Sequence, residues 1–193
     1  MAIDSTKLLL YLITDPHLCS KVGVEQTVDA SVRGGVTMVQ IRDKHASTED
    51  RVALAGRLKP ICASRGALLV INDDIKAVQL SDVDGVHIGQ GDMDVALARQ
   101  TVGADKIVGL SIETESAATQ VSIDLVDYVG ISPVYATPTK RDHKPPIGLQ
   151  GLSKICAASP VSSVAVGGLK LADCNSVMAT GVNGMAVVSA ICG

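Results

Sequence analysis

Residues 68–88 read LLVINDDIKAVQLSDVDGVHI, and this stretch contains the repeating unit that decides the fold. Its two apolar runs, Leu68–Asn72 and Gly85–Ile88, are short, rich in Leu, Val and Ile, and end next to Asp or Gly, as buried strands do. The segment 74–80 between them has the apolar spacing of a short helix. Because a helix connects the two strands, we expect them to run parallel in one sheet that helices cover.

The same alternation of strand and helix continues along the whole chain. Six further apolar runs bounded by Gly, Asp, Asn or Pro predict strands at 8–14, 38–42, 107–111, 128–132, 163–166 and 184–188. The intervening segments have helical spacing and predict helices within 24–32, 52–61, 95–102, 116–123, 151–158 and 172–180.

Eight strands separated by seven helices predict an α/β protein with the architecture of a (β/α)8 or TIM barrel, formed by one domain over residues 1–193. The alternative is an open doubly wound sheet. That fold would place a GxGxxG fingerprint after the first strand, where this chain has Thr14, Asp15 and Pro16. Because the chain stops at Gly193, shortly after the eighth strand, we expect the eighth helix to be missing or truncated.

The composition excludes several functional classes. The 193 residues carry 17 basic and 20 acidic side chains, a net charge of −3, and only 2% are aromatic, so neither nucleic acid nor an anionic membrane is an expected partner. The apolar run at 8–13 is too short to span a bilayer and lacks the features of a signal peptide. Five cysteines without a CxxC spacing indicate reduced thiols rather than disulfides or zinc ligands, and we expect a cytoplasmic protein.

The second predicted strand ends in three polar side chains that share one face. Gln40, Arg42 and Lys44 alternate along the sequence, and alternate residues of a strand point the same way. In a barrel of this type, the carboxyl ends of the strands carry the active site. An amide beside two cations there predicts a diphosphate site, since Arg can give phosphate oxygens two hydrogen bonds. The competing interpretation is ordinary surface charge at a strand end.

Two aspartates follow neighbouring strands at the same end of the predicted barrel. Asp73 comes directly after the third strand, and Asp92 follows the fourth strand in the sequence GQGD. Two carboxylates near cations suit Mg²⁺, which takes one or two protein carboxylates and completes its shell with phosphate oxygens and water. The alternative for Asp73 is the N-cap of the following helix, a position that Asp74 fills equally well.

Two other polar residues in the strands carry weaker signals. Ser111 ends the fifth strand, where it is either a site residue or the cap of the next helix, and no Ser/His/Asp pattern surrounds it. His87 in the fourth strand fits a hydrogen-bonded core histidine as well as a catalytic one.

Two further segments predict contacts with phosphate. The long loop after the sixth strand contains Thr137, Thr139 and Lys140, and it is either a lid over bound phosphate or a solvated basic loop. Gly168 and Ser189 follow the seventh and eighth strands, whose loops form the recurrent phosphate site of this fold.

Taken in order, these features resemble the thiamine phosphate synthase family over essentially the whole chain. The resemblance rests on the segments TDPHL, GGVTMVQIRDK, VINDD, DGVHIGQGD, VGLS, YVGISPVYATPTK, VGGL and GMAVVSA. It implies the (β/α)8 barrel and a transferase of thiamine biosynthesis. Members of this family join hydroxymethylpyrimidine diphosphate to a thiazole phosphate, releasing diphosphate and forming thiamine phosphate.

The resemblance also implies a role for each matching residue. The positions that hold the pyrimidine diphosphate are Gln40, Ile41, Arg42, Asp43, Lys44, Asn72, Ser111 and Lys140. The positions that hold the thiazole phosphate are Thr137, Pro138, Thr139, Gly168, Val188 and Ser189. The Mg²⁺ ligands are Asp73 and Asp92. Arg42, Lys44 and Lys140 are implied to be catalytic, because they would stabilise the departing diphosphate in a dissociative reaction that needs no protein nucleophile.

Three hypotheses about function stay open at this point. The first is the synthase, with small-molecule substrates and a thiazole that either carries or lacks an extra carboxylate. The second is a thiazole tautomerase of the same fold, which would not need the full set of cations and carboxylates. The third is a non-catalytic, phosphate-binding regulatory barrel. The sequence is also compatible with fusion to another thiamine-pathway domain, and it carries no signal for the oligomeric state.

Overall fold

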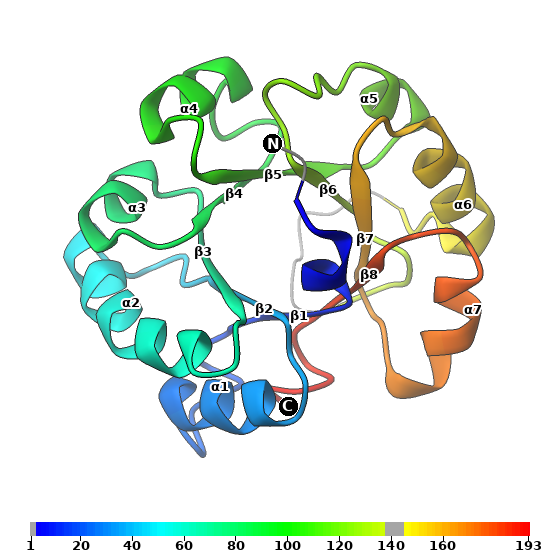
Figure 1. The fold of residues 1–193 in the computed structure, drawn as a ribbon. Coiled ribbons are helices and arrows are strands. Elements are labelled where there is room, and N and C mark those ends of the chain that lie inside the picture. Colours follow the sequence, from blue (N-terminus) through cyan, green and yellow to red (C-terminus); the bar gives the residue numbers. More distant parts are fainter. Residues whose placement is uncertain (1–2, 138–144) are drawn as a thin grey trace.

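Eight parallel strands form a closed barrel in the computed structural model of the chain, which describes residues 3–137 and 145–193. Each strand pairs with the next, and β8 returns to pair with β1, where Leu12 lies opposite Val187. Figure 1 shows the strands around a central axis with the helices outside them. The strands are β1 Leu10–Ile13, β2 Met38–Ile41, β3 Leu68–Asn72, β4 Gly85–Ile88, β5 Ile107–Ile112, β6 Tyr128–Ile131, β7 Ser162–Val166 and β8 Gly184–Val187. The predicted (β/α)8 barrel is confirmed.

Seven helices connect consecutive strands, as the sequence predicts. They are α1 Val24–Arg33, α2 Thr48–Ala63, α3 Ile75–Ser81, α4 Val95–Val102, α5 Glu115–Thr119, α6 Gly148–Ala158 and α7 Cys174–Met178. Side-chain caps fix where four of them begin, because a backbone N–H group in the first turn of α2, α3, α4 and α5 donates a hydrogen bond to Ser47, Asp74, Asp94 and Thr114, respectively. Across the part of the chain that the structure describes, no helix is both long and apolar enough to cross a membrane.

The first strand begins later than its apolar run suggests. Leu8 belongs to a 3-10 helix, η1 (Ser5–Leu8), and its side chain is fully buried inside the barrel. The backbone of Leu8 runs so close to β8 that a Cβ atom on Gly184 would lie 1.8 Å from the Leu8 carbonyl oxygen. The segment η1 therefore closes the N-terminal end of the barrel, where Figure 1 shows it lying across the opening.

Two other segments refine the prediction. The helix α5 ends at Thr119 rather than at 123, because the Ser122 carbonyl accepts hydrogen bonds from Leu125 N and Val126 N in a separate turn. After β8 the chain forms a turn in which Cys192 N donates to Val188 O over 2.9 Å, and no helix follows in residues 188–193.

Two apolar layers lie on opposite sides of the sheet. The outer layer fills the space between the strands and helices and includes Ile41, Ile71 and Ile88. The inner layer fills the barrel with Leu8, Tyr11, Ile13, Met38, Val70, Tyr128, Val164 and Ala186. Because strand side chains alternate between the layers, polar residues at the ends of the inward-facing rows are directed to the mouth of the barrel.

Candidate active site

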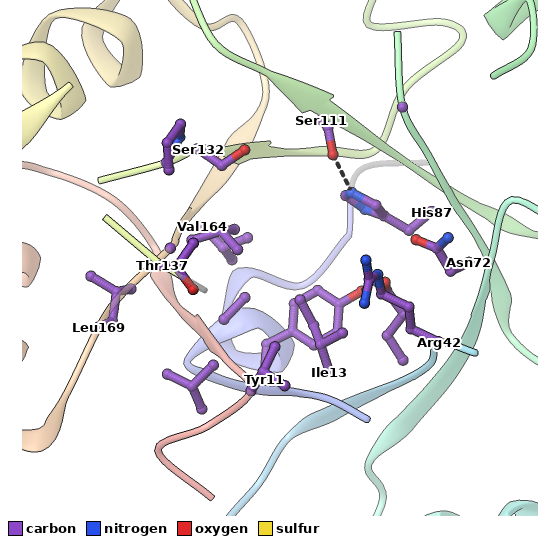
Figure 2. A pocket seen from close by; sticks show the side chains of 18 of the residues that line it. Tyr11, Ile13, Arg42, Asn72, His87, Ser111, Ser132, Thr137, Val164 and Leu169 are labelled. Atoms are coloured by element: carbon purple, nitrogen blue, oxygen red, sulfur yellow. Dashed lines mark hydrogen bonds between the residues drawn. The ribbon is translucent and has the colours of Figure 1, made fainter. Parts of the chain in front are cut away.

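A cavity of about 490 Å³ opens at the carboxyl ends of the strands and is lined by residues from all eight strands or the loops that follow them. We call it the main cavity. Tyr11, Ile13 and Val164 from the inner layer line it together with polar side chains such as Asn72 and His87, as Figure 2 shows. The polar residues that the sequence predicts at the strand ends therefore lie around one space.

The cationic face predicted for β2 lies in this cavity. Gln40, Arg42 and Lys44 all line it, and Gln40 is buried with its side-chain amide donating to the Tyr11 hydroxyl. Thr14 holds the end of β2 in an extended shape, because Thr14 N donates to Gln40 O over 2.9 Å and Arg42 N donates to Thr14 Oγ1 over 3.1 Å. The alternation read from the sequence thus continues past the last residue of the strand.

Ile41 and Asp43, which alternate with Gln40, Arg42 and Lys44, do not face the main cavity. Ile41 is buried in the outer apolar layer, so its side chain does not line the main cavity. Asp43 accepts hydrogen bonds from His45 N and Ala46 N, over 2.9 and 3.2 Å, and stabilises the turn before α2. A ligand in the main cavity could approach Ile41 only through its backbone.

Asp73 and Asp74 have separate roles. Asp74 is the N-cap of α3, and its carboxylate accepts a hydrogen bond from Arg51 Nη1 over 2.9 Å. Burial alone would raise the pKa of Asp74, but hydrogen bonds from Ala77 N, Thr48 and Arg51 outweigh it and hold this pKa below its usual range. Asp74 thus takes the cap, and Asp73 lines the main cavity.

Asp73 and Asp92 form a carboxylate pair at the edge of the main cavity. Burial and the negative charge of Asp92 raise the pKa of Asp73, and a hydrogen bond from Asn72 and the charge of Arg42 offset only part of this effect. Asp92 also accepts a hydrogen bond from Gly89 N over 3.1 Å. A Cβ atom on Gly89 would lie 2.3 Å from that carboxylate, which explains why this turn has glycine.

The carboxylate pair fits a hard divalent cation. In residues 3–137 and 145–193, no group of three or more His, Cys, Asp and Glu side chains gathers around one point, so these two are a pair. Mg²⁺ needs one or two protein carboxylates when phosphate oxygens and water complete its shell. A cation here would also neutralise the repulsion that raises the pKa of Asp73.

The opposite side of the main cavity is formed by the loops after β6, β7 and β8. Thr137, Gly168, Val188 and Ser189 line it there. Gly168 has φ of 68°, and a Cβ atom on it would lie 2.7 Å from the Ala136 carbonyl oxygen. Glycine therefore serves the close packing of two loops as well as leaving backbone N–H groups accessible to an anion. The predicted residues Pro138, Thr139 and Lys140 lie outside the residues that the structure describes.

The structure brings in a cation that the sequence analysis did not single out. Lys170 follows β7, and its Nζ atom donates a hydrogen bond to Ser189 Oγ over 3.1 Å. This places an exposed positive charge beside the predicted site of the second phosphate. A signal was present in the sequence, since Lys170 comes two residues after Gly168 in a loop of the phosphate-binding type.

The two roles considered for His87 and Ser111 can now be compared with their contacts. His87 is buried, with Nδ1 2.9 Å from the Tyr128 hydroxyl and Nε2 2.9 Å from Ser111 Oγ, and Figure 2 shows the second contact at the edge of the cavity. Thr114, rather than Ser111, caps α5. His87 is thus a hydrogen-bonded core residue that also lines the main cavity, and Ser111 lines it as well.

The chain has clear relatives among known protein families and curated proteins. Residues 10–191 match the profile of a family described as thiamine monophosphate synthase. A thiamine-phosphate synthase of a Psychrobacter species is 50% identical over 188 residues, covering 96% of this chain and 88% of the relative. The thiamine-phosphate synthase of Albidiferax ferrireducens is 43% identical over 186 residues, covering 96% and 84%.

Solved structures agree with this relationship. A thiamine phosphate pyrophosphorylase from Pyrococcus furiosus superposes with a TM-score of 0.88 at 31% identity, covering 98% of this chain and 89% of that one. An N-acetylmannosamine-6-phosphate 2-epimerase from Clostridium perfringens superposes with a TM-score of 0.72 at 11% identity, covering 99% and 92%. The second likeness concerns the barrel fold alone.

Proposed function

Because the chain belongs to the thiamine monophosphate synthase family, we propose that it joins 4-amino-2-methyl-5-hydroxymethylpyrimidine diphosphate to 4-methyl-5-hydroxyethylthiazole phosphate. The products are thiamine phosphate and diphosphate. The observation that carries this proposal is a single cavity with two different anion-binding sides. Arg42 and Lys44 lie with two carboxylates on one side, and Gly168 and Ser189 lie on the other.

The cationic side suits the pyrimidine diphosphate. Its diphosphate carries several negative charges, and Arg42 and Lys44 supply fixed positive charge next to it. The pyrimidine ring would then occupy the floor of the main cavity, by which we mean its inner end inside the barrel. There Ile13 and Val164 offer apolar contact and Ser111 offers a hydroxyl group. Few aromatic residues are present, so ring recognition depends on these apolar and hydrogen-bonding contacts.

The side formed by β7 and β8 suits the thiazole phosphate. Backbone N–H groups near Gly168 and the hydroxyl group of Ser189 are neutral donors for a phosphate monoester, and Lys170 adds charge. With each phosphate held on its own side, the thiazole nitrogen and the pyrimidine methylene carbon meet in the middle of the cavity. Holding two reactants in this way lowers the entropic part of the barrier.

The reaction forms one bond and breaks one. The thiazole nitrogen donates its electron pair to the methylene carbon, and the bond from that carbon to the diphosphate oxygen breaks with its electrons on oxygen. In the dissociative form, departure precedes attack, so the protein must stabilise the charge on the leaving oxygen. Arg42 and Lys44, which line the main cavity, would do this, and Lys140 stays a predicted third cation.

We include Mg²⁺ in the proposal as the cation of the carboxylate pair. Asp73 and Asp92 would hold it. When bound, the ion would supply positive charge to the diphosphate oxygens. The pair would otherwise place negative charge next to an anionic substrate, which gives an independent reason for a cation at this position.

The decisive experiment is a direct assay of the purified protein. It uses the pyrimidine diphosphate and Mg²⁺ with thiazole phosphate, either plain or carrying an additional carboxylate, and measures thiamine phosphate and released diphosphate. We expect equal amounts of both products. Arg42→Met should lower kcat/KM by about 100-fold, because a charge on the leaving group would lose its partner. Arg33→Met, on the exposed face of α1, is the matched control and should keep wild-type activity.

Other results would contradict the proposal. If the folded protein forms no thiamine phosphate from either thiazole, the synthase hypothesis fails. Isomerisation of a thiazole carboxylate without any condensation would support the tautomerase instead. Binding of both phosphates without turnover would support the regulatory barrel.

The magnesium proposal has its own test. Asp92→Asn removes one charge of the pair while keeping a similar shape, and we expect the Mg²⁺ concentration at half-maximal activity to rise by about tenfold or more. Asp105→Asn, at an exposed position just before β5 and so at the N-terminal end of the strands, serves as the control. An unchanged Mg²⁺ requirement in the Asp92 variant would remove the metal role from this residue.

A further inference from the structure

A chain of buried hydrogen bonds runs through the floor of the main cavity. The Gln40 side-chain amide donates to the Tyr11 hydroxyl, which lies 2.9 Å from the Tyr128 hydroxyl. Tyr128 in turn lies 2.9 Å from His87 Nδ1, and His87 Nε2 lies 2.9 Å from Ser111 Oγ. The two tyrosines and Gln40 are at most 1% exposed, so water is screened from this part of the hydrogen-bonded chain, whereas His87 and Ser111 line the main cavity.

The direction of this chain follows from counting hydrogens. Each tyrosine hydroxyl has one hydrogen to donate. Since Gln40 Nε2 can only donate, Tyr11 accepts from it, and the arrangement that uses the hydrogen of Tyr11 as well has Tyr11 donating to the Tyr128 hydroxyl. Tyr128 then gives its hydrogen to His87 Nδ1, which must be an acceptor. A neutral imidazole with an accepting Nδ1 has its hydrogen on Nε2, and this hydrogen is donated to Ser111 Oγ.

Burial keeps the chain in this state. It raises the pKa of Tyr11 and of Tyr128 above the usual tyrosine value, so both hydroxyl groups stay protonated at neutral pH. The positions are also fixed by packing. A Cβ atom on Gly109 would lie 2.3 to 2.5 Å from two ring carbons and the hydroxyl oxygen of Tyr128, so the glycine provides the space in which this side chain lies. Fixed donors and acceptors of this kind preorganise a binding site.

We propose that Tyr11 and Tyr128 are positioning residues that hold His87 as the neutral Nε2–H tautomer and thereby make Ser111 a hydrogen-bond donor toward the cavity. With this tautomer Ser111 Oγ accepts from His87, which leaves the hydrogen of Ser111 available to an acceptor in the main cavity that Ser111 lines. Tyr128 is fully buried and does not line the main cavity, so it acts through its neighbours.

The natural partner for such a donor is a ring nitrogen with a lone pair, and this part of the inference rests on the proposed function. The diphosphate is expected at Arg42 and Lys44, on the rim. Ser111 lies by the floor beside His87, and Figure 2 shows the two with Tyr11 and Ile13 around the same space. A pyrimidine nitrogen there would find an oriented O–H group, whereas a C–H at the same ring position would leave that group unpaired.

The tautomer can be measured without any substrate. In protein labelled with ¹⁵N-histidine, the long-range couplings of the ring nitrogens distinguish the two neutral tautomers from each other and from the imidazolium. The signals of His87 are identified by their loss in His87→Gln. We expect the Nε2–H form in the wild type and a mixture of forms in Tyr128→Phe. The control is Tyr135→Phe. It removes the hydroxyl of the protein's third tyrosine, which is not part of these hydrogen bonds, and it should leave the spectrum of His87 unchanged.

Steady-state kinetics then test whether the His87 tautomer contributes to binding of the pyrimidine ring. Tyr128→Phe should raise KM for the pyrimidine diphosphate by about tenfold, the value of one oriented hydrogen bond, with KM for the thiazole phosphate unchanged. Inhibition by inorganic diphosphate should stay the same, since the rim is intact. The last test uses two pyridine analogues of the substrate, each with one of the two pyrimidine ring nitrogens replaced by C–H. We expect the wild type to bind one of these analogues more weakly than the pyrimidine diphosphate, and we expect this difference in affinity to disappear in Tyr128→Phe.

The outcomes separate the inference from the reaction. An Nδ1–H tautomer or an imidazolium in the wild type would overturn the inference even if thiamine phosphate is formed. An Nε2–H tautomer that is equally populated in Tyr128→Phe would overturn the role of the tyrosines. An equal loss of affinity for inorganic diphosphate would overturn the assignment to the ring. Absence of any thiamine phosphate would refute the proposed function and leave the measured tautomer as it stands.

Discussion

Neighbouring residues of this chain take different roles according to the local backbone, and Asp73 and Asp74 show this most clearly. Asp73 has φ of 63°, in the left-handed region that few residues other than glycine adopt. The adjacent Asp74 completes the cap of α3 and the ion pair with Arg51. A carboxylate held in an uncommon backbone conformation next to another carboxylate is typical of a functional position.

Lys170 gives the first prediction at this scale. Lys170→Met keeps the length of the side chain but removes the charge beside Ser189. We expect KM for the thiazole phosphate to rise by about tenfold, with kcat changed much less, because the lost contact holds a phosphate away from the reacting atoms. Steady-state kinetics with each substrate varied in turn provide the measurement.

Lys154→Met on α6 is the matched control, since it removes an exposed lysine elsewhere on the protein. If KM rises for the pyrimidine diphosphate instead, Lys170 contacts that substrate and not the thiazole phosphate, which would contradict the prediction. High salt should reduce the difference between the wild type and Lys170→Met, because an exposed charge is screened.

Residue-level prediction from the sequence succeeded where strand alternation alone decides the direction of a side chain. Arg42 and Lys44 line the main cavity as their spacing predicts, and the same spacing sends Ile41 outward. The contacts of His87 with Tyr128 and Ser111 were beyond reach, because they depend on the register between β4, β5 and β6. No local pattern encodes that register.

At the scale of elements, polar side chains tie the outer helices together at the N-terminal side of β5. Asp82 is the C-cap of α3 and forms ion pairs with Lys59 of α2, over 3.1 Å, and with Lys106 just before β5, over 2.6 Å. These two lysines lower the pKa of Asp82 to about 2. One exposed carboxylate thus connects three segments that are distant in sequence.

The ion pairs of Asp82 predict a pH-dependent stability. Since folding lowers this pKa, the stabilisation is fully present above the ordinary carboxyl pKa and is lost as the pH falls from about 4 toward 2. Asp82→Asn should therefore lower Tm at neutral pH, with a difference from the wild type that shrinks across that range and in about 1 M salt. Asn tolerates the φ of 50° at this position, so backbone strain does not confuse the comparison.

Thermal unfolding followed by circular dichroism is the measurement for Asp82→Asn. The matched control is Asp124→Asn, at an exposed aspartate in the turn that follows α5. A Tm difference that stays constant down to the lowest pH would show that the effect of Asp82→Asn is conformational rather than electrostatic.

The strands and the short helices α3 and α4 were predictable to within about two residues, whereas η1 and the end of α5 were not. Apolar runs end where the strands do, as at β3 and β4, because buried strands need apolar side chains on both faces. The 3-10 helix η1 and the early end of α5 follow from tertiary packing and turn geometry, which override local spacing. Loop contacts such as those near Gly168 are set by the packing of two segments that are far apart in the sequence.

For the whole molecule, closure of the barrel depends on small residues where backbones come close. Gly184 of β8 is in contact with the backbone of Leu8, so the packing of η1 against the last strand depends on the absence of a side chain at this position. The overall architecture was still predictable, because eight regularly spaced repeats of strand and helix have few other ways to bury both faces of a sheet.

Gly184→Ala tests this closure. The added Cβ atom would lie within 3 Å of three backbone atoms of residues 8 and 9, so η1 must move. We expect the free energy of unfolding to fall by about 3 kcal/mol, as for overpacking of a rigid core, in urea denaturation followed by circular dichroism. Gly56→Ala in α2 has open space around it and should raise stability by up to about 1 kcal/mol.

An unchanged denaturation midpoint in Gly184→Ala would mean that η1 contributes little to the sealed barrel. Because the site lies at the opposite end of the strands, the fraction that stays folded should bind inorganic diphosphate as tightly as the wild type does.

The two tyrosines of the barrel floor have an optical consequence. The chain contains three Tyr residues, no Trp and no Phe, so its intrinsic fluorescence comes from tyrosine alone. Two of the three emitters, Tyr11 and Tyr128, are hydrogen-bonded to each other beneath the main cavity. Two of the three sources of emission therefore lie next to the place where a heterocyclic ring would bind, so a ligand titrated into the cavity should change the tyrosine fluorescence of the unlabelled protein.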